Sequence, residues 1–248
     1  MDRSDKIRLL FSIALSFLIW GLLVNWKFSL LVIPAILFHE YGHYHWMGRE
    51  GIKQRSMIMI PPFGAMAIAK EPWPSRAAET RIALAGPVFG FFSALVAYVF
   101  WQLLGYSVLE TAVSLICFIN MFNLVPIPIL DGGRVIKSIL FSISNELGFA
   151  FYIFGFAVLF GAFLFVPSVG LISLFVGFML YQDFKFYCLS PKTLADKNVE
   201  LWTQPLKMGL GAMVSHGLFY VGLILAYFLL SATLSKNPLN FFTSPTPF

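Results

Sequence analysis

Two histidines and a glutamate stand close together in the segment HEYGH, residues 39–43. On an α-helix each residue advances by about 100° and about 1.5 Å, so His39 and His43 lie about 40° apart and about 6 Å along the axis. Glu40 falls on the same side of the helix. Two imidazole nitrogens in this arrangement can bind one zinc ion while the carboxylate reaches a neighbouring water molecule. The spacing therefore predicts a zinc site with His39 and His43 as ligands and Glu40 as the group that moves a proton.

The residues before this segment, FSLLVIPAILF, are those of a membrane-spanning helix. An acidic side chain near the centre of a bilayer costs about 2.5–3.5 kcal/mol, so a group of ionisable residues there needs a compensating partner. Binding of a structural zinc ion can release more than about 10 kcal/mol. The membrane setting favours a metal site, and a buried, hydrogen-bonded group of His and Glu without a metal is the alternative.

A catalytic zinc ion held by two histidines needs a third protein ligand and an open coordination position. Asp131 is the best candidate, because the segment PILDGG follows a predicted span on the face that the HEYGH helix also reaches. Residues 123–133, NLVPIPILDGG, contain two prolines and two glycines and cannot continue a helix. Irregular backbone at membrane depth is tolerated where it is packed in protein or lines a polar cavity. We therefore expect Asp131 to complete the zinc site. A simple turn that ends a helix is the alternative.

The composition is that of a membrane protein. Of the 248 residues, 58% are hydrophobic and only 12% are charged, a balance that a water-soluble domain does not keep on its surface. Because a helix needs about 20 mostly apolar residues to cross the hydrocarbon layer, we expect about seven transmembrane helices. Their expected ranges are 8–24, 28–47, 77–104, 109–125, 147–166, 169–186 and 207–231. The first is expected to be a span and not a cleaved signal peptide, because no small-residue cleavage site follows it.

The positive charges favour one orientation in the membrane. With seven spans, nearly all of the 17 Lys and Arg residues fall on one face, and only Lys27 and Lys236 fall on the other. Lys and Arg accumulate in cytoplasmic loops. We therefore expect an integral, multi-pass protein of the cell (inner) membrane, with the amino terminus in the cytoplasm and the carboxy terminus outside. Nucleic-acid binding is disfavoured, because the charges flank spans instead of clustering.

One segment has the pattern of strands instead of a helix. Residues 55–69, RSMIMIPPFGAMAIA, place β-prone residues before a PPFG turn and alternate small and large residues after it, which predicts a small membrane-associated β-hairpin. The expected fold class is therefore an all-α polytopic membrane protein with one hairpin. We expect a core over residues 1–186, a cytoplasmic linker over 187–206, an additional transmembrane helix over 207–231 and a flexible tail over 232–248.

These motifs resemble those of the site-2 proteases, a family of intramembrane zinc metalloproteases. HEYGH matches the family's HExxH, and FNLVPIPILDGG, residues 122–133, matches its NxxPxPxLDG. LAGPVFGF, residues 84–91, is similar to the family's small-residue motif on the next core helix. The resemblance covers roughly residues 1–186 and implies a six-helix core of the site-2 protease type.

The resemblance implies a role for each residue of the site. His39, His43 and Asp131 would bind zinc, Glu40 would be the catalytic acid and base, and Asn123 would steady the substrate carbonyl or its oxyanion. The implied activity is hydrolysis of peptide bonds within or near transmembrane segments, as in regulated intramembrane proteolysis. The partners would be a transmembrane protein substrate and the lipid bilayer, with no soluble cofactor besides the zinc ion.

Access of water and substrate to the site can also be predicted. Asn120, Asn123 and Asp131 are expected to line a water entrance on the cytoplasmic side. The free edge of the hairpin is a candidate for pairing with an extended substrate by strand addition. A structural re-entrant loop without substrate contact is the alternative for the hairpin.

Two other functions stay open at this point. A zinc or metal transporter also suits broken helices with His and Asp at membrane depth, but ion passage gives no reason for Glu40 beside a ligand histidine. A catalytically silent, protease-like scaffold would have lost Glu40 or a metal ligand, and this sequence retains them.

Overall fold

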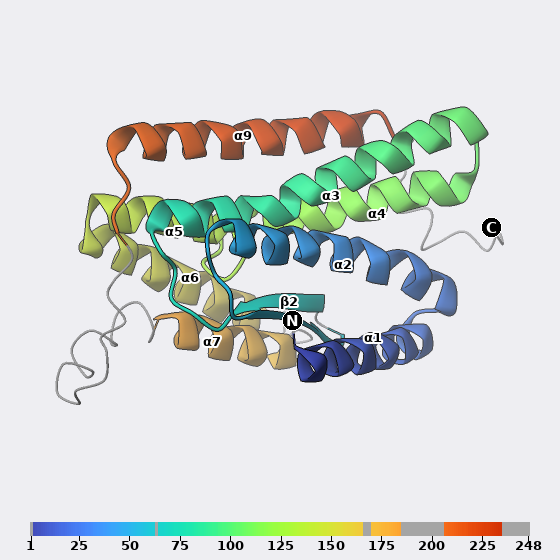
Figure 1. Ribbon diagram of the computed structural model, residues 1–248, viewed down its shortest axis with the longest axis horizontal. Helices are drawn as coiled ribbons and strands as arrows, with labels where there is room; N and C mark the ends of the chain where they lie inside the picture. The colour runs from blue at the N-terminus through green and yellow to red at the C-terminus, as the bar shows by residue number, and fades with distance from the viewer. Residues whose placement is uncertain (1, 63, 166–169, 185–205, 235–248) are drawn as a thin grey trace. The chain divides into compact units, whose positions relative to one another are not determined.

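The computed structural model describes residues 2–62, 64–165, 170–184 and 206–234 (Figure 1). Its elements are, in chain order, helices α1 (Arg3–Leu23) and α2 (Trp26–Arg49), strands β1 (Arg55–Ile60) and β2 (Gly64–Ala69), and helices α3 (Arg76–Leu104), α4 (Ser107–Asn123), α5 (Asp131–Ile143), α6 (Asn145–Phe165), α7 (Gly170–Phe184) and α9 (Leu210–Ala232). This mainly helical fold with one small hairpin confirms the predicted fold class. The predicted linker and tail lie outside the described residues, apart from residue 206 and residues 232–234.

Every predicted span coincides with a helix. Among the described residues, three helices are long and apolar enough to cross a membrane, namely α1, α3 and α9. α4 and the segment Asn145–Gly161 of α6 are shorter apolar helices. α2 is also long, but the polar residues of HEYGH interrupt its apolar run. These helices are those of an integral membrane protein, and the total of seven spans stays a prediction.

The chain falls into two compact units. The first comprises residues 1–71, 82–124 and 218–248, and the second comprises residues 72–81 and 125–217. The first unit therefore contains α1, α2, the hairpin and α4, together with most of α3 and α9. The second contains the start of α3 and the helices α5, α6 and α7.

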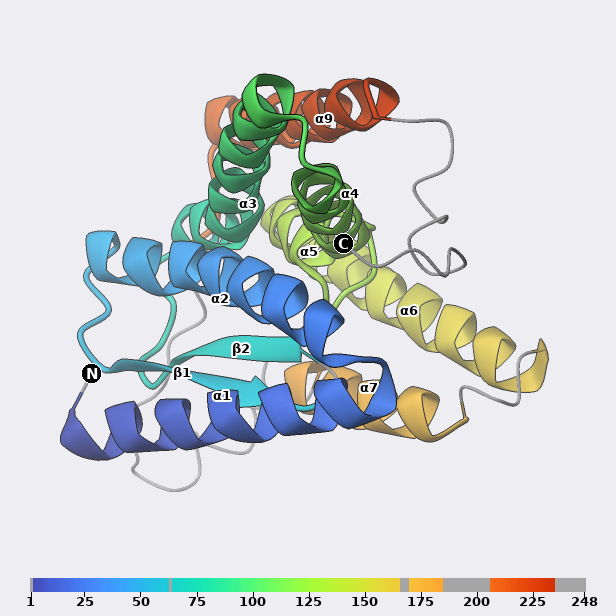
Figure 2. The same cartoon turned by 90° about the vertical axis from the view of Figure 1, so that its right-hand side faces the viewer.

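In the first unit, the hairpin lies between α1 and α2 (Figure 2). β1 and β2 are antiparallel, with Met57 opposite Ala67. Buried side chains of α2 and β1 form an apolar cluster that contains Phe28, Val32 and Met59. The hairpin predicted over residues 55–69 is confirmed, and burial of its apolar residues against α2 explains why this short strand pair is stable.

Polar contacts attach the hairpin to α1. The Met59 amide donates a hydrogen bond of 3.0 Å to Ser12 Oγ. Lys70, just after β2, forms an ion pair of 2.8 Å with the buried carboxylate of Asp5. The outer edge of β1 therefore faces α1.

Helix α9 contributes two hydroxyl groups to the first unit. Tyr220 donates a hydrogen bond of 2.6 Å to the Leu124 carbonyl, which lies just past the end of α4. Tyr227 donates one of 2.7 Å to the Pro87 carbonyl in α3. These bonds stabilise backbone carbonyls within two of the sequence motifs, NLVPIPILDGG and LAGPVFGF. The intramembrane His216 hydrogen-bonds through Nδ1 to the Ala212 carbonyl, 2.5 Å away in the preceding turn of α9.

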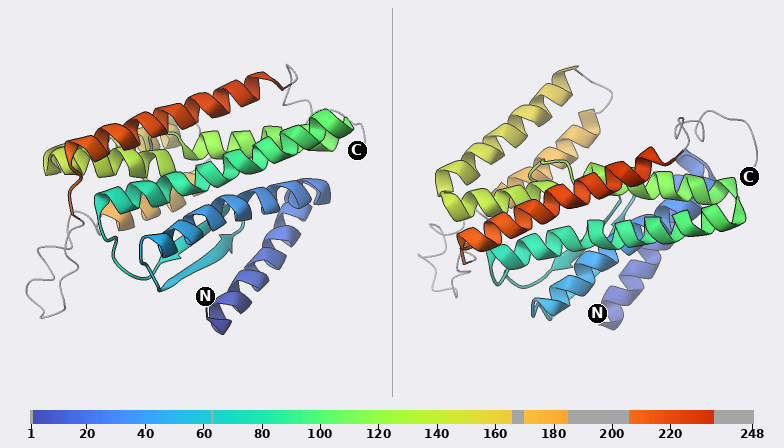
Figure 3. Two further views of the ribbon diagram at one scale, coloured as in Figure 1. Left: turned by 45° about the horizontal axis from the view of Figure 1, so that its top comes forward. Right: turned by 90° about the horizontal axis from the view of Figure 1, so that it is seen from above.

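Helix α5 of the second unit was not predicted from the sequence. The chain leaves helical geometry over residues 124–130, as the two prolines require, and a new helix starts at Asp131. α6 and α7 run side by side (Figure 3). Phe141 of α5, Tyr152 of α6 and Leu180 of α7 form their common core. α5 has only 13 residues, and its buried face combines apolar and charged side chains, so it lacks the long apolar run of a span.

A buried ionic group joins α5 to the start of α3. The Glu79 carboxylate lies 3.4 Å from Lys137 Nζ and 3.8 Å from Arg76 Nη1. It also accepts a hydrogen bond of 2.9 Å from Ser138 Oγ. All four side chains are at most 2% exposed. Since a charge buried without its partner is strongly destabilising, this group fixes α5 against α3.

The Lys137→Met variant is expected to lower the free energy of unfolding by about 3–5 kcal/mol, because it leaves the Glu79 carboxylate buried with less compensation. Denaturant unfolding of the metal-free protein in micelles, followed by circular dichroism, measures the change. Lys53→Met removes an exposed lysine and is the matched control. Equal stability of the two variants would contradict the prediction.

Candidate metal centre

Helix α2 places His39 and His43 on one buried face. The two side chains are 2% and 3% exposed, and their Nε2 atoms lie 3.0 Å apart. His45 lies on the exposed side of the same helix, with its ring near those of Tyr41 and Phe89. The structure therefore brings the two predicted histidine ligands together and leaves His45 outside the pair.

The other nitrogen of each imidazole has an oxygen partner. His43 Nδ1 lies 2.7 Å from the Ile82 carbonyl of α3, so Nδ1 must carry the proton and donate it. His39 Nδ1 lies 2.8 Å from Asn120 Oδ1, and the Asn120 amide nitrogen donates to the Ile116 carbonyl at 2.8 Å. The Asn120 oxygen is therefore the acceptor, and His39 Nδ1 is also a donor. Such partners orient metal-binding histidines and select the tautomer with a lone pair on Nε2.

The hydrogen bonds of the two Nδ1 atoms show whether the Nε2 atoms are able to bind a metal ion. In the neutral tautomers both Nε2 atoms carry lone pairs, and the two lone pairs face each other across 3.0 Å. Two lone pairs at this distance repel each other unless a cation binds to them. This cation is either a proton or a metal ion. The donor set therefore fits a divalent ion of the kind that imidazole binds, including zinc.

Small residues of α3 make room for the histidine pair. A methyl group built on Gly86 would collide with His43 Nε2 and come within 2.9 Å of His39 Nε2. One built on Gly90 would collide with the Asn120 amide, and one on Gly42 of α2 would lie 2.5 Å from the Ala85 carbonyl. The segment LAGPVFGF thus lets α3 approach α2 closely at the two Nε2 atoms. This is the physical role of its small residues.

The Gly86→Ala variant is expected to weaken zinc binding by about 10–100-fold, the range seen when residues that support metal ligands are changed. The added methyl group would occupy the space beside both Nε2 atoms. Competition with a chromophoric chelator measures the affinity. Gly222→Ala in α9, where a methyl group would meet no atom within 4 Å, is the matched control. Unchanged affinity in Gly86→Ala would show that metal does not bind at these nitrogens.

Glu40 is half-buried and points to the hairpin. Its Oε2 atom accepts a hydrogen bond of 2.8 Å from the Ala67 amide of β2. The sequence predicted that this carboxylate would lie on the side of the histidines, but it gave no sign of the contact with β2. The bond connects the candidate acid and base to the hairpin edge.

Two asparagines of α4 differ in their contacts. Asn120 is fully buried and orients His39, whereas sequence reasoning assigned it only to a water entrance. A polar residue within the apolar run SLICFIN was the available signal. Asn123 is half-buried, and its side-chain nitrogen donates 2.9 Å to the Ile119 carbonyl of its own helix. The predicted role of Asn123 toward a substrate stays a prediction.

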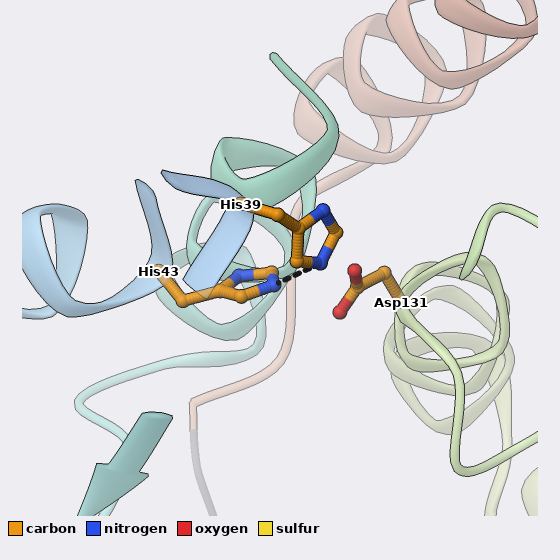
Figure 4. A group of neighbouring side chains, drawn as sticks. All are labelled: His39, His43 and Asp131. Carbon is orange, nitrogen blue, oxygen red and sulfur yellow. Dashed lines mark hydrogen bonds between the residues drawn. The ribbon is translucent and has the colours of Figure 1, made fainter. Parts of the chain in front are cut away.

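Asp131 is the first residue of α5 and is 6% exposed. A helix start carries partial positive charge, which favours a carboxylate there. Gly133 lets the preceding loop close over this start, because a methyl group on it would collide with the Ile127 carbonyl. Figure 4 draws the side chains of His39 and His43, which belong to the first unit, and of Asp131, which belongs to the second.

The apolar helices and the buried pair of imidazoles define the class of protein. It is an integral membrane protein with a candidate metal centre. Residues 27–116, which include HEYGH and LAGPVFGF, match Peptidase family M50. This stretch of the chain is therefore similar to the M50 (site-2 protease) family, as the motifs predicted.

Curated relatives agree with this assignment. The protein named zinc metalloprotease MJ0392 of Methanocaldococcus jannaschii is 30% identical over 116 residues, which cover 45% of this chain and 33% of that protein. A relative from Synechocystis sp. is 29% identical over 130 residues, which cover 48% of this chain and 32% of the relative. The matches thus span about a third of the length of each relative.

The fold is similar to that of a solved structure, the Site-2 Protease from Methanocaldococcus jannaschii. The TM-score is 0.52 with 24% sequence identity, over 70% of this chain and 86% of that chain. The similarity extends beyond the M50 match and supports the site-2-protease-like fold.

Proposed function

We propose that this protein is an intramembrane zinc metalloprotease that hydrolyses peptide bonds within or near the transmembrane segments of membrane proteins. The observation that carries the proposal is the orientation of the two imidazoles, whose Nδ1 atoms are held as donors and whose Nε2 atoms face each other. A histidine pair that only stabilised the fold would not need both Nε2 atoms directed at the same point.

The proposed zinc ligands are His39, His43 and Asp131. Two neutral imidazoles and one carboxylate are a common donor set of catalytic zinc sites, in which a fourth position stays open. The burial of all three side chains supports the assignment. When bound, zinc would supply the Lewis acidity that activates water and polarises the scissile carbonyl.

The residues of the chain supply the remaining chemistry. Glu40 takes a proton from the attacking water and delivers it to the leaving amine, a role that typically contributes about 10²–10⁴ in rate. The Asn123 side-chain amide donates to the oxyanion that forms in between, and such a donor is typically worth about 10²–10³ in rate. The role of Asn123 rests on the resemblance of the NxxPxPxLDG motif.

The proposed substrate is a transmembrane helix that becomes extended near the site. A peptide bond within a helix is shielded, so the segment must unwind before hydrolysis. The outer edge of β2, adjacent to Glu40, is the proposed place where the extended segment pairs. The distribution of Lys and Arg supports a cytoplasmic amino terminus, an external carboxy terminus and entry of water from the cytoplasmic side of the cell membrane.

Metal analysis of the purified full chain tests the proposal. We expect one zinc ion per chain and cleavage of a test protein with a single transmembrane helix. Removal of zinc with a chelator should abolish cleavage, and added zinc should restore it. Cleavage that persists unchanged in the zinc-free protein would overturn the proposal, as would a folded protein that binds no divalent metal.

A further inference from the structure

The second half of α9 presents one buried face within the first unit. Four buried side chains follow one another there at intervals of three or four residues, namely Tyr220, Leu223, Tyr227 and Leu230. This spacing places them on one side of the helix. Leu225 and Leu229, on the opposite side, are more than half exposed. The buried face therefore packs against protein, and the opposite side is left for lipid.

Tyr227 is the residue of this face that bonds to α3. Its side chain is fully buried, and its hydroxyl group donates a hydrogen bond of 2.7 Å to the Pro87 carbonyl. Its ring also meets the Phe91 ring edge-on, with the ring centroids 5.3 Å apart. Phenylalanine would fill the same space without needing a partner, whereas a buried hydroxyl group is costly unless it is bonded. The hydrogen bond and the ring contact attach α9 to one particular turn of α3.

Pro87 weakens this turn of α3. The proline lies inside the helix. It has no N–H to donate to the Ala83 carbonyl, and its ring presses against the preceding turn. Helices bend at such positions. The turn from Ala83 to Pro87 therefore has less support from the bonds of its own helix than the rest of α3, and the bond from Tyr227 adds support from outside.

The same turn lies beside the histidine pair. The Ile82 carbonyl, just before the turn, is 2.7 Å from His43 Nδ1 and orients this ring. Gly86, next to Pro87, lies so close to His43 that a methyl group on it would collide with Nε2. A displacement of the turn would therefore move both the acceptor that orients His43 and the backbone beside its Nε2 atom.

We propose that Tyr227 is a positioning residue of the metal centre, through which α9 holds the Pro87 turn of α3 and sets the affinity of the histidine pair for a metal ion. The inference rests on the proposed function, because it takes zinc as the ion that His39 and His43 bind. α9 lies outside residues 27–116, the stretch that matches Peptidase family M50, so the match itself gives this helix no role.

The first test observes the histidine rings directly. The full chain contains four histidines, so ¹⁵N-histidine labelling in micelles gives few imidazole resonances. The Nδ1–H resonance of His43 reports its bond to the Ile82 carbonyl before any zinc is added. Tyr227→Phe removes only a hydroxyl group, and we expect it to shift this resonance. Tyr220→Phe removes a hydroxyl group from the same face of α9, one that bonds to Leu124, and should leave the resonance in place.

A His43 resonance that is unchanged in Tyr227→Phe would overturn the proposal. Equal shifts in Tyr227→Phe and Tyr220→Phe would also overturn it, because the effect would then come from looser packing of α9 as a whole.

The second test measures zinc affinity by competition with a chromophoric chelator. We expect Tyr227→Phe to lose about tenfold in affinity, the lower end of the range for residues that support metal ligands. Tyr106→Phe, at an exposed position, is the matched control and should bind zinc like the wild type. Wild-type affinity in Tyr227→Phe would overturn the proposal.

The Pro87→Ala background tests whether Tyr227 acts through this turn. Alanine restores the N–H that can bond to the Ala83 carbonyl, so the turn should no longer need support from α9. Adding Tyr227→Phe to Pro87→Ala should then lower zinc affinity by less than about twofold, a coupling that a double-mutant cycle detects. The same loss in both backgrounds would overturn the proposal.

Cleavage by the wild-type protein, measured on the same preparation, tests the proposed function separately. A zinc affinity that depends on Tyr227, without zinc-dependent cleavage, would reject the protease and retain the positioning role. Zinc-dependent cleavage together with wild-type zinc affinity in Tyr227→Phe would retain the protease and reject the role of Tyr227.

Discussion

The Glu40→Gln variant is expected to retain one zinc ion per chain and to cleave a transmembrane test substrate about 10²–10⁴-fold more slowly than the wild type. Glutamine preserves the size of the side chain and can still accept a hydrogen bond from Ala67, but it cannot take a proton from water. The histidines keep their oxygen partners, so the metal affinity should stay unchanged. Parallel measurements of zinc content and of single-turnover cleavage separate the two effects.

Glu146→Gln is the matched control, because Glu146 is exposed at the start of α6. It should leave both zinc content and cleavage unchanged. Undiminished cleavage by Glu40→Gln would exclude Glu40 as the acid and base. Metal uptake into vesicles that survives this substitution, without any cleavage by the wild type, would favour a transporter.

The second large effect is expected for Asp131→Asn. Under the proposed coordination this change replaces an anionic ligand by a neutral amide of the same shape. Zinc affinity should fall by more than about 100-fold, because even changes to residues that only support a ligand cost about 10–100-fold. Cleavage should fall with zinc occupancy and recover in part at high zinc concentration. Chelator competition measures the affinity, and cleavage over a zinc titration measures the recovery.

Asp2→Asn is the control for Asp131→Asn. Asp2 caps the start of α1, where its side chain accepts from the Asp5 amide at 2.7 Å, and asparagine is an equally good cap. Both variants should keep the helical circular dichroism of the wild type. If Asp131→Asn binds zinc with wild-type affinity, Asp131 is not a zinc ligand. The histidine pair would then have a different third ligand.

Much of the candidate site could be predicted from the sequence because the relevant rules are local. The helical repeat puts His39 and His43 on one face, and both are buried there. The strand pattern and the PPFG turn predict the hairpin, whose register spans Arg55 to Ala69. The prolines of NLVPIPILDGG predict the break after α4. Each of these inferences needs only residues that are near one another in the chain.

Other features required the tertiary structure. Lys137 lies on the buried face of α5. From sequence alone a lysine is expected to be exposed, because lysine is almost never fully buried without a partner. Only the packing against the start of α3 supplies Glu79 as its partner. The same holds for Asn120, which orients His39 from a position 81 residues away in the chain.

The sequence by itself therefore determined that the chain is a membrane protein with a histidine pair at a spacing suited to zinc, an adjacent glutamate and a hairpin. Only the tertiary structure decided that Gly86 leaves room for the two imidazole nitrogens, that Asn120 and Ile82 select their tautomers, and that Glu40 bonds to Ala67. The physical reason is that periodicity fixes the direction of a side chain relative to its own helix or strand. The depth and rotation at which two elements meet depend on the shapes of many side chains packed together.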